Sequence, residues 1–547
     1  MLRTPPRRAV LLAAGALIVA LAACDSGDPD DDAGKDLAGN RAGAMAQYKV
    51  GDQFTATEPL SFSILYNNHP NYPLNENWLM WTELTKRTNV KLEPVAVPLS
   101  DYEQKRSLLI GAGDAPFIIP KTYHPQENTF VSSGAILPVS DYIDLMPNLK
   151  DKIAKWSMKP EMDSLRQADG KYYLLPGLHE KAWQDYSIAM RTDVLQQLGL
   201  QVPKTWDDLY TVLKAMKAAH PDTYPFSDRF SKPTPGGNLL NIVTKSYGTY
   251  GGWDYQHATW NESAKKYEYT GATPQYKQAI EYLHKLVSEG LLDPESFTQT
   301  DDAARQKLAT GKSFVISSNA QNIVNDYRPD LAKTIPNATI AKIPLPIGPA
   351  GEINPATRTE NGVMISRKAR DSKNFVAMMQ FIDWLFYSDA GQEFAKWGVE
   401  GVTYTKDASG KRTLTPDVNV IGLNPKGTKH LQKDFGFYNG VFAYGGNLEL
   451  VQSFFSPEEM EFQKVLNARK TFVLPPPYPF TDEEREQATL WETPLKDHVT
   501  QNTLRFILGQ RPLSEWDAYV SELKAKNSNQ YMDLVNKAYE RFKKNNG

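Results

Sequence analysis

The chain has 547 residues, with 61 Lys and Arg against 64 Asp and Glu and a formal charge of −3. Nucleic-acid binding calls for Lys and Arg clustered on one face, and because no such cluster is present, nucleic acid is not expected as a partner. The single cysteine, Cys24, excludes an internal disulfide and any metal site built on clustered cysteines.

The N-terminus has the order of residues typical of a secretory signal. Three arginines precede an apolar run over residues 9–23, and Cys24 follows directly. The apolar run is shorter than the roughly 20 residues that a membrane-spanning helix needs. The tetrapeptide Leu21-Ala22-Ala23-Cys24 resembles the lipobox of bacterial lipoproteins. We therefore expect a signal peptide over residues 1–23 and lipid attachment, including palmitate, at Cys24. The alternative is a cysteine that only ends a signal peptide or a single-pass anchor.

The segment that follows Cys24 predicts a flexible acidic tether over residues 24–45. It is rich in Asp, Gly and Ala and nearly devoid of large apolar side chains, so it buries too little surface to fold. Asp28, Asp30 and Asp32 have the first spacings of a calcium loop. Ala33 stands where the turn glycine belongs, and Gly39 stands where the closing glutamate belongs. No metal and no other cofactor are therefore expected.

Strands and helices alternate from residue 61 onward, which is typical of a parallel α/β protein. Apolar runs predict strands at residues 61–66, 90–97 and 116–120, with helices at residues 77–88 and from residue 101 between them. Later strands are predicted at residues 171–175, 186–190, 313–317, 339–345 and 362–366.

Capping residues predict several helices between these strands. Thr205 with Asp208 has the pattern of a helix start, and Thr273 with Pro274 and Gly290 brackets another helix. A run with four prolines over residues 474–479 indicates a rigid connector. From Thr481 the chain is predicted to be helical.

Motifs along nearly the whole mature chain resemble the large lipoprotein subgroup of family 1 of the bacterial extracellular solute-binding proteins, which serves sugar and oligosaccharide importers of the ABC class. The order and spacing of these motifs carry the resemblance more than any one of them. The motifs are Ala168-Asp169-Gly170-Lys171-Tyr172-Tyr173, residues 189–194, Leu198-Gly199-Leu200, Val202-Pro203-Lys204-Thr205-Trp206-Asp207-Asp208-Leu209, residues 289–295, Asn361-Gly362, Phe381-Ile382-Asp383-Trp384-Leu385 and Gly398-Val399-Glu400-Gly401-Val402-Thr403-Tyr404.

The resemblance implies a two-lobe periplasmic-binding-protein-like fold of type II, with hinge strands between the lobes and a helical C-terminus. A mature chain of about 500 residues also exceeds what one hydrophobic core usually serves. Lobe 1 is expected over residues 46–187 plus about 362–440, lobe 2 over residues 188–361, and a helical region packing on both over residues 441–547. Some oligosaccharide-binding relatives carry a calcium loop where this chain has residues 220–226, and this segment lacks its Asp/Asn-rich pattern, so no calcium is expected there.

Candidate ligand-binding residues follow from a general rule, because open parallel sheets bind ligands at the carboxyl ends of their strands. Polar and aromatic side chains at those ends suit a sugar, which needs hydrogen bonds to its hydroxyls and aromatic faces against its CH groups. The rule selects Asn67, Asn68, His69, Tyr123 and Asn319. Loop and motif positions add Trp253, Trp397 and Tyr404 as stacking platforms and Glu360 and Glu400 as acceptors of sugar hydroxyl groups.

Each of these residues also has a purely structural interpretation. Trp81, Trp384 and Trp516 lie at helical spacing and are expected in the core, so they are left out. His69 can cap a turn before Pro70, and the acidic candidates can be solvated or structural carboxylates. Glu360 and Glu400 rank higher only through the resemblance.

An enzyme is the less favoured class. No Gly-x-Ser-x-Gly elbow is present, and His179-Glu180 has no second histidine at metalloprotease spacing. The expected protein is a monomeric, non-catalytic receptor on the outer face of the cell membrane. It captures a sugar or oligosaccharide by hinge closure and delivers it to ABC permease subunits. The alternatives are a secreted carbohydrate-active enzyme, whose paired carboxylates no sequence spacing can test, and a peptide-binding receptor.

Overall fold

The computed structural model describes residues 37–230, 234–472 and 474–546. The predicted signal peptide, Cys24 and most of the predicted tether lie outside these residues. Within them, no helix combines the length and the apolar character needed to cross a membrane. The last part of the predicted tether is bound to the folded chain, because the Asn40 side chain donates to the backbone oxygens of Arg370 and Ser372 at 3.1 and 2.9 Å. The ordered chain therefore starts before residue 46, where we expected it.

The first sheet has five strands in the order β2-β1-β3-β11-β4. β1 (Leu60–Asn68) pairs in parallel with β2 (Val90–Pro98) and with β3 (Ile118–Thr122). β11 (Thr359–Ile365) inserts antiparallel between β3 and β4 (Leu175–Leu178). β4 begins later than the predicted strand at residues 171–175, because residues 167–171 form a turn closed by Gln167 N donating to Lys171 O at 2.7 Å.

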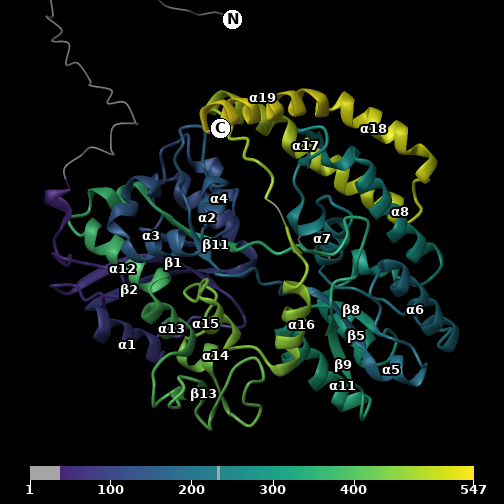
Figure 1. The fold of residues 1–547 in the computed structure, drawn as a ribbon, viewed down its shortest axis with the longest axis horizontal. Helices are drawn as coiled ribbons and strands as arrows, with labels where there is room; N and C mark the ends of the chain where they lie inside the picture. The colour runs from purple at the N-terminus through teal and green to yellow at the C-terminus, as the bar shows by residue number, and fades with distance from the viewer. Residues whose placement is uncertain (1–36, 231–233, 473, 547) are drawn as a thin grey trace, which may run out of the picture. The chain divides into compact units, whose positions relative to one another are not determined.

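Six helices pack with this sheet (Figure 1). α12 is buried along its whole length, as its almost uninterrupted apolar sequence requires. The six are α1 (Leu79–Thr88), α2 (Tyr102–Gly111), α3 (Pro147–Lys155), α4 (Lys159–Asp163), α12 (Phe375–Tyr387) and α13 (Asp389–Trp397).

The second sheet has the order β8-β5-β9. β5 (Ser187–Arg191) runs antiparallel to both β8 (Val315–Ser318) and β9 (Ile340–Ile343). Pairing in this sheet is therefore antiparallel, because alternation along the chain does not fix the direction in which a returning strand enters a sheet. The helices of this part are α5 (Thr192–Gln197), α6 (Trp206–Ala219), α7 (Gly237–Ser246), α8 (Pro274–Ser288), α9 (Asp301–Ala309), α10 (Ala320–Asn322) and α11 (Arg328–Thr334).

The predicted helix starts are confirmed where local capping sets them. Thr205 Oγ1 accepts from Asp208 N, and Asp208 accepts in return from Thr205 N, each at 3.0 Å. Thr273 likewise caps α8 by accepting from Tyr276 N at 3.2 Å. These bonds satisfy backbone N–H groups that an α-helix leaves without partners at its start.

Two large hydrophobic cores divide the described chain. The first joins buried residues between Phe54 and Leu178 with a later group between Val363 and Phe454. The second joins residues between Ile188 and Leu345 with a later group between Phe462 and Tyr539. The start of the predicted C-terminal region, residues 441–454, packs in the first core.

The C-terminal helices cover the second core. α17 (Asp482–Ile507) lies beside α8, and Tyr276 Oη hydrogen bonds Thr503 Oγ1 at 2.9 Å (Figure 1). α18 (Trp516–Ala525) and α19 (Ser528–Asn546) pack with α17. Preceding them are α14 (Leu431–Phe435), α15 (Leu448–Gln452) and α16 (Pro457–Asn467). Short strand pairs are β6 (Ala258–Asn261) with β7 (Lys266–Tyr269), β10 (Ile353–Asn354) with β16 (Lys470–Thr471), β12 (Tyr404–Lys406) with β13 (Arg412–Leu414), and β14 (Val418–Asn419) with β15 (Lys429–His430).

Candidate functional site

The carboxyl ends of β1 and β3 meet at one edge of the first sheet, because the two strands are parallel neighbours. β1 ends with Asn67 and Asn68, and His69 follows. The Asn67 side chain is buried, and its Oδ1 has no hydrogen-bond partner among the described residues. Asn68 Oδ1 accepts from Leu74 N at 2.9 Å. The His69 ring stacks on Tyr72 with centroids 4.7 Å apart. A buried acceptor without a partner is costly unless a ligand or water supplies a donor, so this edge is suited to binding.

Lys121 and Tyr123 form the other half of this edge. The Lys121 ammonium donates to Tyr123 Oη at 3.2 Å, and the Tyr123 side chain is 48% exposed. Lys121 has a φ of 55°, in the left-handed region that non-glycine residues rarely adopt and that occurs more often at functional sites. Burial, together with the charge of Lys121, lowers the pKa of His69 to about 4. His69 is therefore neutral near pH 7, with one ring nitrogen that donates and one that accepts.

The second sheet has a matching edge. Phe226 bridges in parallel to Val315 of β8, so residues 226–228 and β8 end on the same side. Arg229 and Phe230 follow the first of these segments, and Asn319 follows β8. β5 runs the opposite way and begins here, directly after Asp185 and Tyr186.

Hydrogen bonds join the polar groups of this second edge. The Asn319 amide donates to Asp185 Oδ2 at 3.3 Å, and Arg229 Nη2 donates to Asn322 Oδ1 at 2.5 Å. The Arg229 guanidinium lies 3.8 Å from the centroid of the Phe230 ring. The edge therefore presents amide, carboxylate and guanidinium groups next to an aromatic ring.

Three rings form an aromatic cluster at this edge: Tyr186, Phe230 and Trp253. Trp253 meets Tyr186 and Phe230 edge to face, with centroids 5.3 and 4.6 Å apart. Trp253 reaches this position because Gly237 has no side chain, since a Cβ there would lie 2.2 Å from Trp253 Nε1. The indole remains 38% exposed, so it can still meet a ligand.

Two tyrosines, Tyr186 and Tyr438, have pKa values raised above the ordinary value. Burial raises the pKa of Tyr186, and Asp185 and Tyr123 raise it further. Burial also raises the pKa of Tyr438, with contributions from Asp185 and Glu360. Both phenols therefore stay protonated near pH 7 and can donate a hydrogen bond.

The model of the family described as bacterial extracellular solute-binding protein matches residues 76–393. The chain belongs to this family. Among curated proteins, the solute-binding protein is 25% identical over 571 aligned positions to the fructooligosaccharide ABC transporter substrate-binding protein FusA of Streptococcus pneumoniae, covering 99% of each chain. It is 24% identical over 476 positions to the polygalacturonan/rhamnogalacturonan-binding protein YtcQ of Bacillus subtilis, covering 84% of this chain and 88% of the relative.

A solved structure shares the fold of the solute-binding protein. The alginate-binding protein AlgQ2, crystallised without calcium ion, superposes with a TM-score of 0.70 at 21% identity, covering 89% of this chain and 99% of AlgQ2. The expected type II fold is therefore confirmed. The three relatives are all binding proteins by name.

Three predicted site residues of the solute-binding protein lie away from both edges. Trp397 is 1% exposed, packs 4.4 Å from the Phe454 ring, and donates through Nε1 to Ser453 Oγ. Tyr404 is also buried and packs 5.6 Å from Trp397. Glu400 is exposed in the turn that bridges to Tyr404. Trp397 and Tyr404 belong to the first core and have no free face, so they cannot act as stacking platforms in this arrangement.

Glu360 lies on β11 and contacts two segments beside that strand. Its carboxylate accepts from Gly445 N and lies 3.6 Å from His179 Nε2. Burial alone would raise the pKa of Glu360, but His179, Lys396 and the Gly445 N–H together lower it to about 2. Glu360 is an anion that already has partners, which leaves it less free to accept sugar hydroxyl groups.

Sequence reasoning missed part of the second edge. Arg229 and Phe230 were not selected, although the strand-end rule applies to them. Asp185 and Tyr186, which precede β5, and Asn322, on α10, were not selected either. The sequence feature that could have revealed Arg229 and Phe230 is the short apolar segment at residues 225–226. This segment pairs with β8 but is too short to be recognised as a strand. Among the described residues, no group of three or more His, Cys, Asp or Glu side chains is placed to hold a metal ion.

Proposed function

We propose that this solute-binding protein captures a sugar or oligosaccharide and delivers it to the permease of an ABC importer. The ligand would bind between the two sheet edges described above, the one at Asn67 and Tyr123 and the one at Asp185 and Asn319, which we call the strand edges. The observation that carries the proposal is the aromatic cluster of Tyr186, Phe230 and Trp253 beside Asn319 and the Arg229–Asn322 pair. Aromatic faces bind the CH groups of a sugar ring, and amide and charged groups bind its hydroxyls. FusA and YtcQ, whose names state saccharide ligands, support this class of ligand.

The mechanism is binding without chemistry. A ligand that contacts groups on both edges binds the closed arrangement of the two cores more tightly than the open one, so it shifts the protein toward closure. Tyr123 and His69 would contact the ligand from the first sheet, and the aromatic cluster from the second. A permease that recognises the closed form would then accept the loaded protein.

Replacing Trp253 tests the binding site. Trp253→Ala removes one aromatic face, and because an aromatic contact contributes about 0.5–1.5 kcal/mol beyond its buried area, affinity should fall about tenfold. Calorimetry with fructo-oligosaccharides and with oligogalacturonates supplies the measurement and covers a neutral and an acidic ligand. Tyr224→Ala, an aromatic side chain with 41% exposure on the surface, is the matched control and should bind like wild type.

Three outcomes would count against the proposal. Unchanged affinity in Trp253→Ala would remove the aromatic cluster from the site. Release of shortened saccharides during incubation would indicate a carbohydrate-active enzyme. A melting temperature raised by peptides and not by any saccharide would indicate a peptide receptor.

The same proposal places the protein at the outer face of the cell membrane, attached through lipid on Cys24. Such an anchor keeps a capture protein within reach of its permease. Cys24→Ser should move the protein from the membrane fraction to the soluble fraction, measured by fractionation and immunoblotting. Retention of the variant in the membrane would contradict lipid anchoring, and Ser26→Ala, two residues further along, serves as the control.

A further inference from the structure

A cavity of about 1070 Å³ lies among the segments that connect the two cores. We call it the hinge cavity and define it by Glu161, Glu180, Lys181, Arg358, Gln452 and Lys464. Glu161 comes from α4, Glu180 and Lys181 from the segment after β4, and Arg358 from the segment before β11. Gln452 ends α15, and Lys464 lies on α16. None of these residues belongs to the two strand edges, so the hinge cavity is a separate site.

On the side of the first core, two carboxylates of the lining, Glu161 and Glu180, can accept further hydrogen bonds. Glu161 pairs through Oε1 with Arg358 at 2.6 Å. Glu161 is only 8% exposed, yet its second oxygen, Oε2, has no hydrogen-bond partner among the described residues. Glu180 accepts from Leu448 N at 2.7 Å and forms no ion pair within the described chain. A buried carboxylate oxygen without a donor is costly, so this wall favours a ligand that supplies N–H groups.

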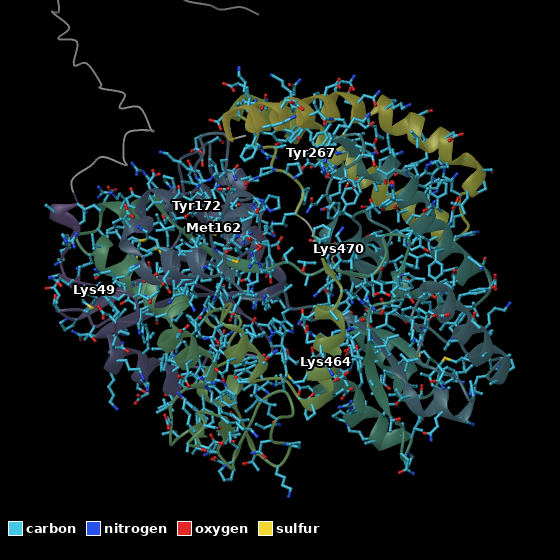
Figure 2. The ribbon with its side chains drawn as sticks, in the orientation of Figure 1. Lys49, Met162, Tyr172, Tyr267, Lys464 and Lys470 are labelled. Atoms are coloured by element: carbon cyan, nitrogen blue, oxygen red, sulfur yellow. The ribbon has the colours of Figure 1, made fainter. Side chains whose placement is uncertain are left out.

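Two lysines of the lining, Lys181 and Lys464, carry positive charge, and each lies close in sequence to a glutamate of the lining, Glu180 or Glu461. Lys464 lies on α16, whose Phe462 and Leu466 belong to the second core (Figure 2). Its nearest carboxylate is Glu461 at 3.5 Å, and both side chains are largely exposed. Lys181 forms no ion pair in the part of the chain that the structure describes. Lys181 is therefore free to meet a carboxylate, and Lys464 can exchange its exposed pair with Glu461 for a ligand carboxylate, because exposed pairs contribute little.

Charge and size together indicate the class of ligand. Three acidic and three basic side chains line the cavity, so a net-neutral ligand with separated charges fits better than an anion or a cation. The volume is at the upper end of the roughly 300–1,000 Å³ typical of small-molecule sites. No aromatic side chain lines the cavity itself, which makes it a poor sugar site. We propose that the hinge cavity binds a short zwitterionic peptide, with its ammonium at Glu161 and Glu180 and its carboxylate at Lys181 and Lys464.

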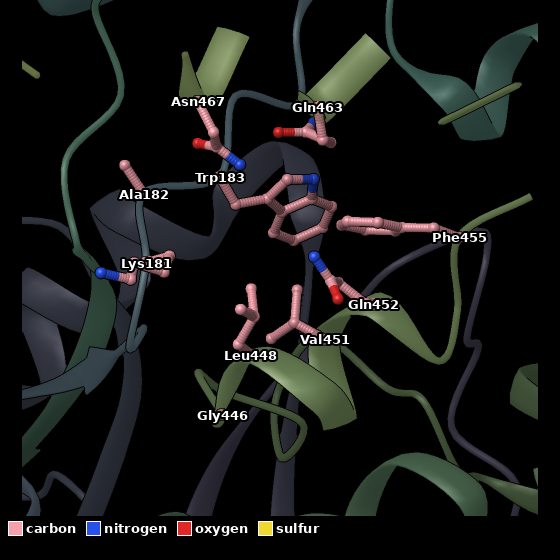
Figure 3. Close-up of a pocket in the computed structure, with 10 residues that line it drawn as sticks. All are labelled: Lys181, Ala182, Trp183, Gly446, Leu448, Val451, Gln452, Phe455, Gln463 and Asn467. Carbon is pink, nitrogen blue, oxygen red and sulfur yellow. The ribbon is translucent and has the colours of Figure 1, made fainter. Parts of the chain in front are cut away.

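A small adjoining pocket links the hinge cavity to the movement of the cores. It shares Lys181, Gln452 and three other residues with the cavity, and the indole of Trp183 lies inside it between α15 and α16 (Figure 3). The Trp183 ring lies 5.9 Å from the Phe455 ring. α15 packs with the first core and α16 with the second, so any relative movement of the cores reshapes both spaces.

Peptide binding is therefore coupled to sugar binding, and this second half of the inference rests on the proposed function. A ligand whose site changes shape with the cores has different affinities for the open and closed arrangements. The coupling is reciprocal, so peptide in the hinge cavity changes the affinity for sugar at the strand edges by the same factor as sugar changes the affinity for peptide.

Calorimetry on the full-length protein with trialanine tests the cavity. Trialanine should bind, and trialanine blocked at both ends should bind at least tenfold more weakly, because it lacks both charges. Lys464→Gln should weaken trialanine binding at least fivefold, whereas Lys433→Gln, an exposed lysine on α14, should leave it unchanged. Absence of trialanine binding, or equal binding by the blocked peptide or by Lys464→Gln, would overturn the proposal.

Filling the cavity supplies a second variant. Ala468→Trp, directly after α16, places an indole in the lining and should abolish trialanine binding, whereas Val465→Trp, on α16 but outside the lining, should not. Saturating trialanine should also change the dissociation constant for a bound saccharide at least threefold. An unchanged constant would overturn the coupling while leaving the peptide site. Absence of any saccharide binding, with trialanine binding intact, would count against the proposed function alone.

Discussion

Trp253 and Trp397 show how differently two tryptophans beside glycines can be used. Both stood next to glycines in the sequence, and both were predicted as stacking platforms. In the structure Trp253 is 38% exposed within the aromatic cluster, whereas Trp397 is 1% exposed inside the first core. Local sequence could not separate them, because burial depends on Phe454, which returns to Trp397 from far along the chain.

Asp228 at the second edge gives a pH prediction at the scale of one residue. It is 1% exposed, its Oδ1 accepts from Ser317 N at 2.7 Å, and burial raises its pKa to about 6. The folded protein therefore keeps a proton that the unfolded chain releases above pH 4, so stability from this group rises as pH falls through 6.

Wild type should gain about 1 kcal/mol of unfolding free energy between pH 7 and pH 5 relative to Asp228→Asn, which cannot titrate. Urea unfolding at both pH values measures this difference. Asp222→Asn, at an exposed position, is the control and should keep the pH dependence of wild type. Identical pH slopes in wild type and Asp228→Asn would show that Asp228 titrates normally.

At the scale of elements, helix starts were predictable and short strands were not. Thr205 with Asp208 and Thr273 with Pro274 fixed their helices because a cap acts over a few neighbouring residues. The segment at residue 226 was missed because its pairing with β8 joins residues distant in sequence. Half of the second edge depends on that pairing, so the sequence identified Asn319 but not Arg229 or Phe230.

A buried ion pair joins α16 to β9. Lys342 Nζ lies 2.8 Å from Glu459 Oε2, with side-chain exposures of 3% and 7%. Lys342→Met leaves Glu459 buried without its cation, which should lower the unfolding free energy by about 3–5 kcal/mol. Lys342→Met combined with Glu459→Leu should recover much of the loss, because no unpaired charge remains.

Urea unfolding of both variants measures these changes. Lys333→Met removes a pair with Asp330 in which the lysine is 73% exposed, so it should change stability by less than about 1 kcal/mol. If the Lys342→Met variant were as stable as wild type, the pair would not hold α16 in place.

At the scale of the whole molecule, the chain builds each core from separate stretches. The first core closes only when residues 363–454 return to residues 54–178, and the second only when residues 462–539 join residues 188–345. Several segments therefore connect the cores, and they line the hinge cavity. Bending at these segments is the movement that the proposed capture of a ligand requires.

Labels on the two cores should report this movement. In a Cys24→Ser background, spin labels at Lys86→Cys on α1 and Lys333→Cys on α11 span both cores, and double electron–electron resonance gives their distance distribution. A saturating saccharide should shift that distribution, because closure moves one core relative to the other. Labels at Lys265→Cys and Lys333→Cys both lie on the side of the second sheet, so the distance between them should not change when saccharide binds. Equal distributions with and without saccharide for the first pair would contradict hinge closure.

The sequence by itself determined the fold class, most helices and strands and the family, and it predicted the residues of the first candidate edge. These depend on short-range patterns such as caps, apolar periodicity and motif order. The tertiary structure decided the antiparallel entry of β5 and β11, the burial of Trp397 and Tyr404, and the meeting of Asp185, Arg229 and the aromatic cluster. It also decided the hinge cavity, whose charged lining comes from two helices and two connecting segments. Contacts of this kind depend on which distant segments share a core, and no local pattern encodes that choice.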